Sequence, residues 1–401
     1  MTGTAAGAKG AAGATGANSA SNAAKKPAKN SENSKTSKPA KKSPRNGGKR
    51  RKGRLRTVCT VIARILVAIA VVGCLCRMLP ASFQALPMVP VIVAFSPWFL
   101  VVAGIALVLA LASRRWMTVF LAVLCICAQV YWQSPYYRWS DSLSNAARTA
   151  VSQVKHDTDD AYARVMTANV FKGNADADDI VELVRDNHVE VLALQEITQS
   201  FVDRLDEAGI ESYLPYAITA SIGDGGIGNG LWSATPMSHM ADAEISSVAS
   251  RMPAATLTFA ADADGDLSLG DGEREIRFVC VHTTSPKAGQ WSRWKTSIEQ
   301  LRQLTERTGI DYVLMGDFNS TTDHAPFREV LGDRYKDAAE SSGSGLEFTW
   351  PNDWGIVPPF AGIDHIVVED GVAVGQVEAK SIGGSDHKAL LATLDFSTMG
   401  E

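Results

Sequence analysis

Three apolar stretches in the first third of the chain constrain its architecture most strongly. They cover residues 57–76, 91–112 and 117–132, and Arg64 is the only charged residue inside them. About twenty consecutive apolar residues cross the hydrocarbon core of a bilayer as a helix. Three such stretches in succession, almost free of charge, argue against core helices of a soluble protein. The sequence therefore predicts three transmembrane helices, over about residues 57–79, 91–112 and 116–134.

The distribution of charge around these stretches predicts their orientation. The chain has a formal net charge of −4, yet residues 1–56 contain fifteen Lys and Arg residues and a single acid, Glu32. Arg114 and Arg115 form the short loop between the second and third stretches. Positive charges beside membrane spans are retained in the cytoplasm. We therefore expect a multi-pass protein of the cytoplasmic membrane, with a cytoplasmic N-terminus and, after three spans, an extracytoplasmic C-terminal domain.

The composition of the remaining segments completes the expected domain organisation. Residues 1–56 are rich in small, polar and basic residues, so we expect a disordered cytoplasmic tail. Its basic end, residues 49–56, runs directly into the first apolar stretch and fits a juxtamembrane cluster better than a nucleic-acid patch. Residues 57–135 contain no acid, which favours an anchor over a transporter or channel. Residues 136–161 form a polar connector, and a globular domain covers residues 162–398.

Strand-like and helix-like patterns alternate along residues 162–398, which predicts an α/β domain. Helices are expected at 176–187, 198–207, 290–307 and 325–331. Strands are expected at 163–170, 189–195, 231–233, 254–259, 275–282, near 313–316, at 364–368 and at 390–395. Cys280 is the only cysteine in this part of the chain, so the sequence offers neither a disulfide framework nor a zinc-type Cys cluster.

Polar clusters stand at the ends of apolar runs throughout this domain. Gly316 is followed by Asp317 and Asn319, which lie two residues apart and so face the same way in an extended segment. Five other clusters have the same character: Thr167–Val170, Leu194–Glu196, Val281–Thr283, Ile363–His365 and Ser385–His387. Each alone fits a cap or a turn. Together they indicate one site at the ends of the strands.

The six clusters, in this order, resemble the endonuclease/exonuclease/phosphatase (DNase I-like) superfamily, here in a membrane-anchored bacterial type. The superfamily includes DNase I-like nucleases, inositol polyphosphate 5-phosphatases and bacterial sphingomyelinases. The resemblance covers about residues 165–395 and implies a four-layer α/β sandwich, in which two mixed β-sheets are flanked by helices. It also implies a metal-dependent hydrolase that acts on phosphoric ester bonds.

The resemblance implies a role for each residue of the clusters. Glu196, with Asn169 beside it and Asp386 as a further candidate, would bind Mg²⁺, or else Mn²⁺ or Ca²⁺, which prefer oxygen ligands. Five residues would carry the catalysis: His387 against the scissile phosphate, Asp364 orienting it, Asp317 positioning or deprotonating water, Asn319 holding a phosphate oxygen or that aspartate, and His282 as a general acid or phosphate ligand. Which group serves as acid and which as base stays open, as does the number of metal ions.

The substrate is expected to be a phosphoester, namely a lipid headgroup, a nucleic acid or a small phosphodiester. Residues 136–401 carry a net charge of −22, which gives little attraction to DNA. A membrane anchor would hold the site near lipid headgroups. Both points favour a phosphodiesterase on the outer face of the membrane, with an extracytoplasmic nuclease or a non-catalytic binding relative as alternatives. The lipid bilayer is an expected partner, and the sequence implies no obligate protein partner.

Overall fold

The computed structural model describes residues 47–138, 143–153, 158–223, 225–263 and 272–399. The predicted disordered tail lies outside this range up to residue 46. From Gly47 onward the chain is helical, so the basic residues before the first apolar stretch belong to helix α1 (Gly47–Met78) and not to a disordered segment. The connector contains a short 3₁₀ helix, η1 (Ser134–Tyr137), and helix α6 (Asn145–Ala150).

The apolar part of the chain forms three main helices, not all of them long. α1 and α5 (Trp116–Gln133) are long and apolar enough to cross a membrane, whereas α4 (Trp98–Ala112) has only 15 residues. The single helix predicted over 91–112 is divided in two, because α3 (Val89–Ala94) ends before α4 begins. Pro97 accounts for the break, since a proline lacks an N–H and disfavours the helical conformation of the residue before it.

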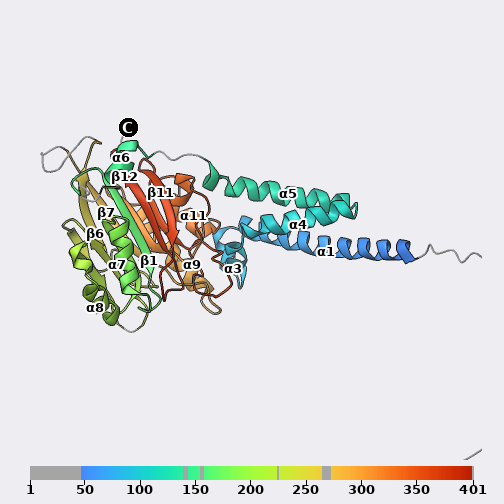
Figure 1. Ribbon diagram of the computed structural model, residues 1–401, viewed down its shortest axis with the longest axis horizontal. Coiled ribbons are helices and arrows are strands. Elements are labelled where there is room, and N and C mark those ends of the chain that lie inside the picture. Colours follow the sequence, from blue (N-terminus) through green and yellow to red (C-terminus); the bar gives the residue numbers. More distant parts are fainter. Residues whose placement is uncertain (1–46, 139–142, 154–157, 224, 264–271, 400–401) are drawn as a thin grey trace, which may run out of the picture. The chain divides into compact units, whose positions relative to one another are not determined.

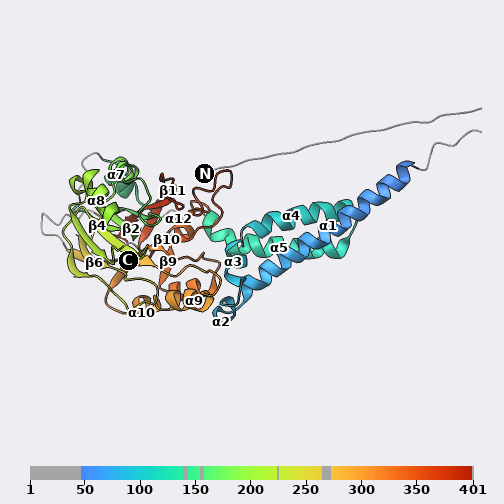
Figure 2. The ribbon, with the colours of Figure 1, turned by 90° about the horizontal axis from the view of Figure 1, so that it is seen from below.

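Small residues lie between these helices and large apolar residues face outward. Ala70, Ala103 and Ala106 are buried in the contacts between the helices, and α2 (Ala81–Gln84) follows α1. In contrast, Val108 is 65% exposed. α4 and α5 lie alongside one another in both views (Figures 1 and 2). Small residues at helix contacts and large apolar residues outside are the arrangement expected where lipid, not water, surrounds the helices.

The remainder of the chain forms two six-stranded mixed sheets (Figure 1). The first has the order β11-β12-β1-β2-β4-β3 and the second β5-β6-β7-β8-β10-β9. The first sheet consists of β1 (Tyr162–Asn169), β2 (Val191–Ile197), β3 (Tyr216–Ala220), β4 (Gly228–Ser233), β11 (Ala373–Lys380) and β12 (Ala389–Asp395). The second consists of β5 (Ser238–Ala241), β6 (Ala254–Ala260), β7 (Glu273–His282), β8 (Asp311–Asp317), β9 (Tyr335–Asp337) and β10 (Asp364–Glu369). Among the strands described, β1–β2 and β7–β8 are the parallel pairs.

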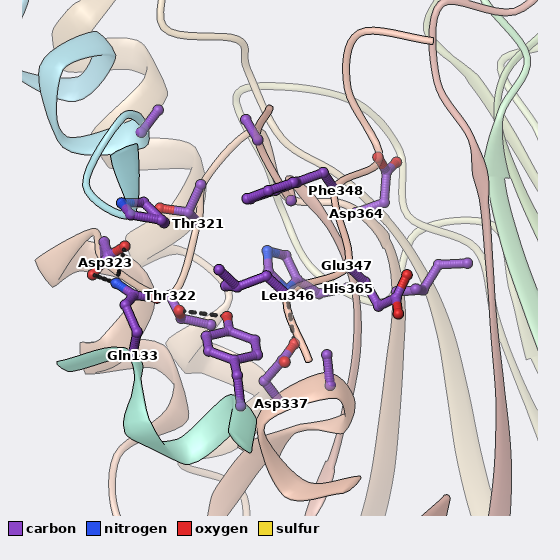
Figure 3. A pocket seen from close by; sticks show the side chains of 17 residues that line it. Gln133, Thr321, Thr322, Asp323, Asp337, Leu346, Glu347, Phe348, Asp364 and His365 are labelled. Atoms are coloured by element: carbon purple, nitrogen blue, oxygen red, sulfur yellow. Dashed lines mark hydrogen bonds and ion pairs between the residues drawn. The ribbon is translucent and has the colours of Figure 1, made fainter. Parts of the chain in front are cut away.

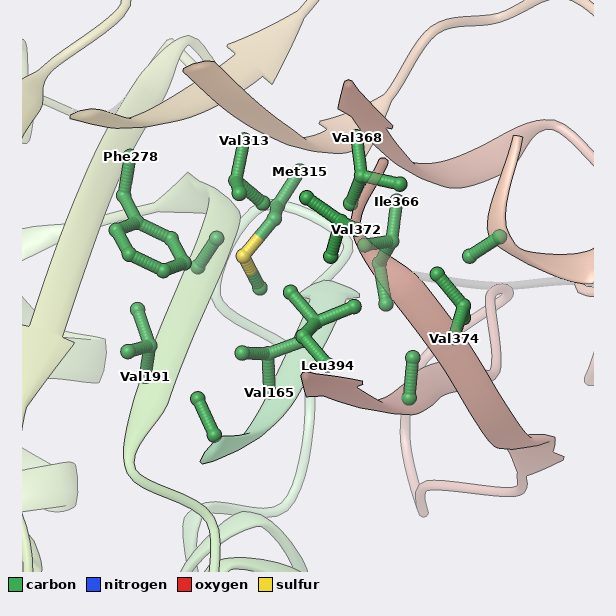
Figure 4. Close-up of a cluster of buried hydrophobic side chains, with 14 of the residues drawn as sticks. Val165, Val191, Phe278, Val313, Met315, Ile366, Val368, Val372, Val374 and Leu394 are labelled. Atoms are coloured by element: carbon green, nitrogen blue, oxygen red, sulfur yellow. The ribbon is translucent and has the colours of Figure 1, made fainter. Parts of the chain in front are cut away.

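Three apolar clusters hold the layers together. The central one lies between the sheets and includes Val165, Phe278, Met315 and Leu394 (Figure 4). The second packs α7 (Ala177–Asp186) and α8 (Gln199–Glu207) against the first sheet. The third packs α9 (Trp291–Glu299), α10 (Arg302–Thr305) and α11 (Ala325–Leu331) against the second sheet. Together with the short η2 (Ile210–Ser212) and α12 (Ala338–Ser342), these elements form the predicted sandwich of two mixed sheets flanked by helices.

Some element predictions differ from the structure. The helix expected over 290–307 is divided into α9 and α10, where Leu301 donates its N–H to Ile298, three residues back, and tightens the turn. The four strands that the pattern missed are β3, β5, β9 and β11, which are the four edge strands of the two sheets. β3 and β5 are largely exposed, β9 has only three residues, and a bulge interrupts β11 between Gly375 and Glu378, so none of the four shows a regular apolar–polar alternation.

Strand register brings the polar clusters to one end of the sandwich. His282 pairs with Asp317 between β7 and β8, and Asp317 pairs with Asp364 between β8 and β10. Asn169 ends β1 and pairs with Gln195 of β2. Six strand ends therefore meet at this edge: the carboxyl ends of β1, β2, β7 and β8 and the amino ends of β10 and β12.

Gly316 allows β8 to approach β7 at this edge. Its φ is +152°, and a Cβ placed on it would lie 1.9 Å from the backbone oxygen of Val281. We expect Gly316→Ala to displace β8 and to lower the free energy of unfolding by about 3 kcal/mol, as overpacking of a core does. The measurement is the denaturant midpoint of the purified protein.

Gly309→Ala is the matched control, because Gly309 has a φ of +77° and a Cβ placed on it would have no atom within 4 Å. It should cost only the backbone strain of about 1 kcal/mol. Equal midpoints for the two variants would show that close approach of the strands is not what requires a glycine at position 316.

Candidate functional site

Asp317, at the end of β8, is held by several N–H donors. Its side chain is 2% exposed. Oδ1 accepts a hydrogen bond from the backbone N–H of Asn319 (2.7 Å), and Oδ2 accepts one from the side-chain amides of Asn319 and of Asn169 (3.0 Å each). Burial raises the pKa of Asp317 to about 7, although the positive charge of His387 opposes the rise. The carboxylate is thus fixed in one orientation at the centre of the site.

His387 is oriented by a second buried carboxylate. Its Nδ1 lies 2.8 Å from Oδ2 of Asp364, and its Nε2 lies 3.9 Å from Oδ2 of Asp317. Burial alone would lower the pKa of His387, but the two carboxylates outweigh burial and raise it to about 10. Because Nδ1 is engaged by Asp364, Nε2 is the ring nitrogen available to a bound molecule.

Ser385 joins the two halves of the site. Its hydroxyl donates a hydrogen bond to the backbone oxygen of Asn169 (2.7 Å) and accepts one from the backbone N–H of His387 (3.0 Å). The end of β1 and the loop before β12 are therefore tied to one another. This contact explains why a serine stands at the first position of the Ser385–His387 cluster.

Glu196 occupies a β-bulge in β2. The register with β4 shifts between Gln195 and Ile197, and Glu196 has a φ of +61°, a conformation that non-glycine residues rarely adopt. Bulges re-aim a side chain and are frequent beside active sites. Here the bulge turns the Glu196 carboxylate toward the cavity, where Oε2 accepts a hydrogen bond from the backbone N–H of Lys172 (3.0 Å). Nothing in the sequence indicated this bulge.

His282 lies across from these carboxylates as a neutral ring. Its Nε2 is 3.8 Å from Glu196 and 4.0 Å from Asp317, and its Nδ1 has no hydrogen-bond partner among the described residues. Burial lowers the pKa of His282 to about 4, and the positive charge of His387 contributes. A neutral imidazole with both nitrogens free of strong partners can donate to, or accept from, a bound molecule.

These side chains line a cavity of about 470 Å³. Six of the eight predicted site residues line it: Glu196, His282, Asp317, Asn319, Asp386 and His387. The other two, Asn169 and Asp364, stand directly behind and bond to Asp317 and His387. The structure thus brings all eight predicted residues together. Asn229 of β4, a buried polar residue outside this set, donates to Ser250 and to the backbone of Arg251.

The sequence did not reveal several residues that line the cavity. Lys172 and Lys287 are exposed cations in it, and Lys287 could have been noticed as a basic residue shortly after a strand-end histidine. Val91, Ala94 and Phe95 of the α3 region also line it. No local pattern could have shown that contact, because the α3 region lies far along the chain from most of the site residues.

His365, adjacent to Asp364, points away from the cavity. Its Nδ1 lies 2.7 Å from Asp337 and its Nε2 2.7 Å from the backbone oxygen of Ser320. Figure 3 shows the ring of His365 directed at Asp337 and away from Asp364. This agrees with the alternation of side chains along a strand, and His365 therefore serves the packing of the loop after Asn319 and not the reacting groups.

The donor set fits a hard divalent cation. Asp317, Asp364 and His387 each offer a ligand atom within 4.8 Å of the others, but the hydrogen bonds described above already engage them. Glu196 and Asp386 face the cavity with side chains 19% and 25% exposed. Burial raises the pKa of Glu196, and the negative charge of Asp386 adds to this rise. A bound cation would offset the repulsion between these two carboxylates and favour their ionised forms.

A two-sheet sandwich with this set of carboxylates and histidines at one edge has the groups that phosphoester hydrolases use. The family model described as Endonuclease/Exonuclease/phosphatase family matches residues 166–387. The chain therefore belongs to the endonuclease/exonuclease/phosphatase family. No match was found among curated protein sequences.

Solved structures with a similar fold include a truncated TDP2 from Caenorhabditis elegans, with 16% identity and a TM-score of 0.45, covering 58% of this chain and 97% of that chain. A second is an endonuclease/exonuclease/phosphatase from Bacteroides vulgatus, with 19% identity and a TM-score of 0.42, covering 58% of this chain and 98% of that chain. A third is D. rerio TDP2 complexed with a single-strand DNA product, with 17% identity and a TM-score of 0.45, covering 59% of this chain and 99% of that chain.

Proposed function

We propose that the protein is a membrane-anchored, metal-dependent phosphoesterase that hydrolyses phosphodiester or phosphomonoester bonds at the outer face of the cytoplasmic membrane. The observation that carries this proposal is the convergence of Glu196, Asp317, His387 and His282 on one cavity at the edge of the sandwich. Membership of the endonuclease/exonuclease/phosphatase family supports the same reaction class.

The residues divide the chemistry between them. A divalent cation held by Glu196, Asn169 and Asp386 would neutralise charge on the phosphoryl oxygens and polarise them. Mg²⁺ is the first candidate, with Mn²⁺ or Ca²⁺ as alternatives, because the ligands are carboxylate and amide oxygens. The amide nitrogen of Asn169 donates to Asp317 and Glu196, and its oxygen accepts the backbone N–H of Phe171 (2.9 Å). A cation bound by this side chain would therefore have to replace part of this hydrogen bonding.

The proton-handling groups surround the position of the phosphate. Asp364 orients the His387 ring so that Nε2 contacts the scissile phosphate. Asp317, fixed by Asn319, positions or deprotonates the attacking water. Asn319 also donates to the backbone oxygen of Thr283, which ties it to the end of β7. His282 either protonates the leaving group or binds a phosphate oxygen.

The helical segment supports membrane anchoring. α1 and α5 have the length and composition of membrane-spanning helices. α4, at 15 residues, extends about 22 Å, so a third crossing also requires α3 and the turn between the two helices. Basic residues stand at the start of α1, and the Arg114–Arg115 pair stands just before α5. The opposite ends of these two helices carry Arg77 and Gln133, which contact Asp323 of the sandwich. Retention of the basic ends in the cytoplasm would leave the catalytic domain outside.

The first prediction concerns catalysis by the full chain in lipid nanodiscs with Mg²⁺ and bis-p-nitrophenyl phosphate as substrate. We expect His387→Ala and Asp317→Asn each to lower kcat by about 10²-fold or more, as removal of positioned acid–base groups does. His239→Ala is the control, because His239 is exposed on β5. Full activity of either site variant, with unchanged circular dichroism, removes that residue from the mechanism. Binding of phosphoesters without turnover would identify a non-catalytic relative.

A second prediction concerns the metal. EDTA should abolish activity, and Mg²⁺ or Mn²⁺ should restore it. Glu196→Gln removes one negative ligand and should weaken Mg²⁺ binding in isothermal titration calorimetry by about tenfold or more. Glu211→Gln is the matched control, since Glu211 is exposed and outside the cavity. Unchanged affinity of the Glu196 variant would mean that Glu196 is not a ligand.

A third prediction concerns topology. Protease added to intact cells or protoplasts should digest the domain that follows η1, while an N-terminal tag before α1 stays protected. A reporter that functions only in the cytoplasm should show no activity when it is fused after Glu401. An active reporter would contradict the orientation and would place the substrate inside the cell.

A further inference from the structure

One wall of the cavity is apolar and is shared between the apolar helices and a loop of the sandwich. Val91, Ala94 and Phe95 supply one part of it, from α3 and the residue that follows. Trp350, Trp354 and Phe360 supply the other part, from the loop before β10. None of these side chains carries a group that takes part in phosphoester chemistry. The wall therefore calls for an explanation other than catalysis.

Aromatic contacts make this wall a continuous surface, which we call the aromatic wall. Phe95 stacks on Phe360 with ring centroids 4.8 Å apart. Trp350 packs edge-on against both Phe360 (5.3 Å) and Trp354 (4.8 Å). The indole N–H of Trp98, the first residue of α4, donates to the backbone oxygen of Phe360 (2.9 Å). The loop before β10 is thus attached to the apolar helices, and the cavity is shared between the two.

Both segments that build the aromatic wall also expose large apolar side chains. Phe83 and Met88, just before α3, are 55% and 54% exposed, and Trp354 and Ile356 of the loop are 48% and 101% exposed. Such clusters mark interaction sites when they occur on a protein surface. Here they flank the helices with membrane-spanning character, so the medium that covers them is the edge of the bilayer.

The opposite side of the cavity is polar and charged. Glu196, Asp386 and His387 lie there, and the exposed cations Lys172 and Lys287 line the same space. A molecule that fills the cavity therefore meets hydrocarbon on one side, and on the other side meets groups that can bind an anionic phosphate.

We propose that the substrate is an amphiphilic phosphoester whose hydrocarbon chain lies along the aromatic wall, while its phosphate reaches His387 and Asp317 from the bilayer edge. This inference rests on the proposed function. Water supplies a hydroxyl to phosphorus and a proton to the leaving oxygen as one P–O bond breaks. A phosphodiester thus gives an alcohol and a phosphomonoester, and no further reactant is needed.

The test uses alkyl 4-nitrophenyl phosphates with chains from ethyl to dodecyl, with the full chain in lipid nanodiscs and Mg²⁺. Each methylene group that enters the aromatic wall should raise kcat/KM by roughly two- to fourfold, until the chain fills the wall and the rise stops. Thymidine 5′-(4-nitrophenyl) phosphate is assayed beside them. A rate that does not depend on chain length, together with faster cleavage of the thymidine ester, would indicate a nucleotide site and overturn the inference.

Variants of the aromatic wall distinguish binding by the wall from partition of the chain into lipid. Trp354→Ser should lower the dodecyl-to-ethyl ratio of kcat/KM by about fivefold or more. Phe95→Ala should act in the same direction. Tyr216→Ser, at a 40% exposed aromatic residue of β3, is the matched control and should leave the ratio unchanged. The same ratio in all four proteins would show that the wall does not hold the chain.

A binding measurement separates failure of this inference from failure of the proposed function. Ethyl and dodecyl phosphonate, which cannot be hydrolysed at the P–C bond, are titrated calorimetrically into the wild type and the Trp354→Ser protein. Tighter binding of the dodecyl compound that is lost in the variant supports the aromatic wall even if no ester is hydrolysed. If the ethyl ester is hydrolysed but chain length affects neither rate nor binding, the proposed phosphoesterase function is kept and the inference of an amphiphilic substrate is rejected.

Discussion

A buried carboxylate, Asp323, joins the apolar helices to the α/β sandwich, and the position of the site depends on it. Arg77 of α1 forms an ion pair with it, and the Gln133 amide of α5 donates to both of its oxygens (3.2 and 3.1 Å). The neighbouring His324 accepts the backbone N–H of Thr321 at Nδ1, so its Nε2 carries the proton and donates to the backbone of Pro90 (2.8 Å). Breaking a buried ion pair leaves an uncompensated charge, which is strongly destabilising.

This junction links anchoring to chemistry through a short piece of chain. The loop from Ser320 to His324 follows Asn319 directly, and Asn319 fixes Asp317. Tyr136, just beyond α5, adds a hydrogen bond to Thr322 (2.7 Å). The helices therefore do more than tether a free domain, because they hold the segment behind Asp317, and Val91, Ala94 and Phe95 supply part of one wall of the cavity.

The sequence predicted the centre of the sandwich better than its borders, for a physical reason. Central strands such as β8 are buried on both faces and appear as unbroken apolar runs. Edge strands such as β5 are exposed, so nothing in their composition separates them from loops. The apolar composition of 91–112 likewise predicted one span. Composition carries no information on helix breaks, so it missed the division at Pro97 into α3 and α4. The bulge at Glu196 was also invisible, since it depends on register with β4.

The sequence by itself predicted the apolar helices and the α/β class, because hydrophobic periodicity is a local property. Its resemblance to a known superfamily picked out the eight polar residues of the candidate site. Tertiary structure alone decided what surrounds those residues. The left-handed backbone of Glu196, the lowered pKa of His282 and the placement of Phe95 against Phe360 each arise from contacts between segments far apart in the chain. Burial and close approach of charges set protonation and access, and neither can be obtained from a one-dimensional pattern.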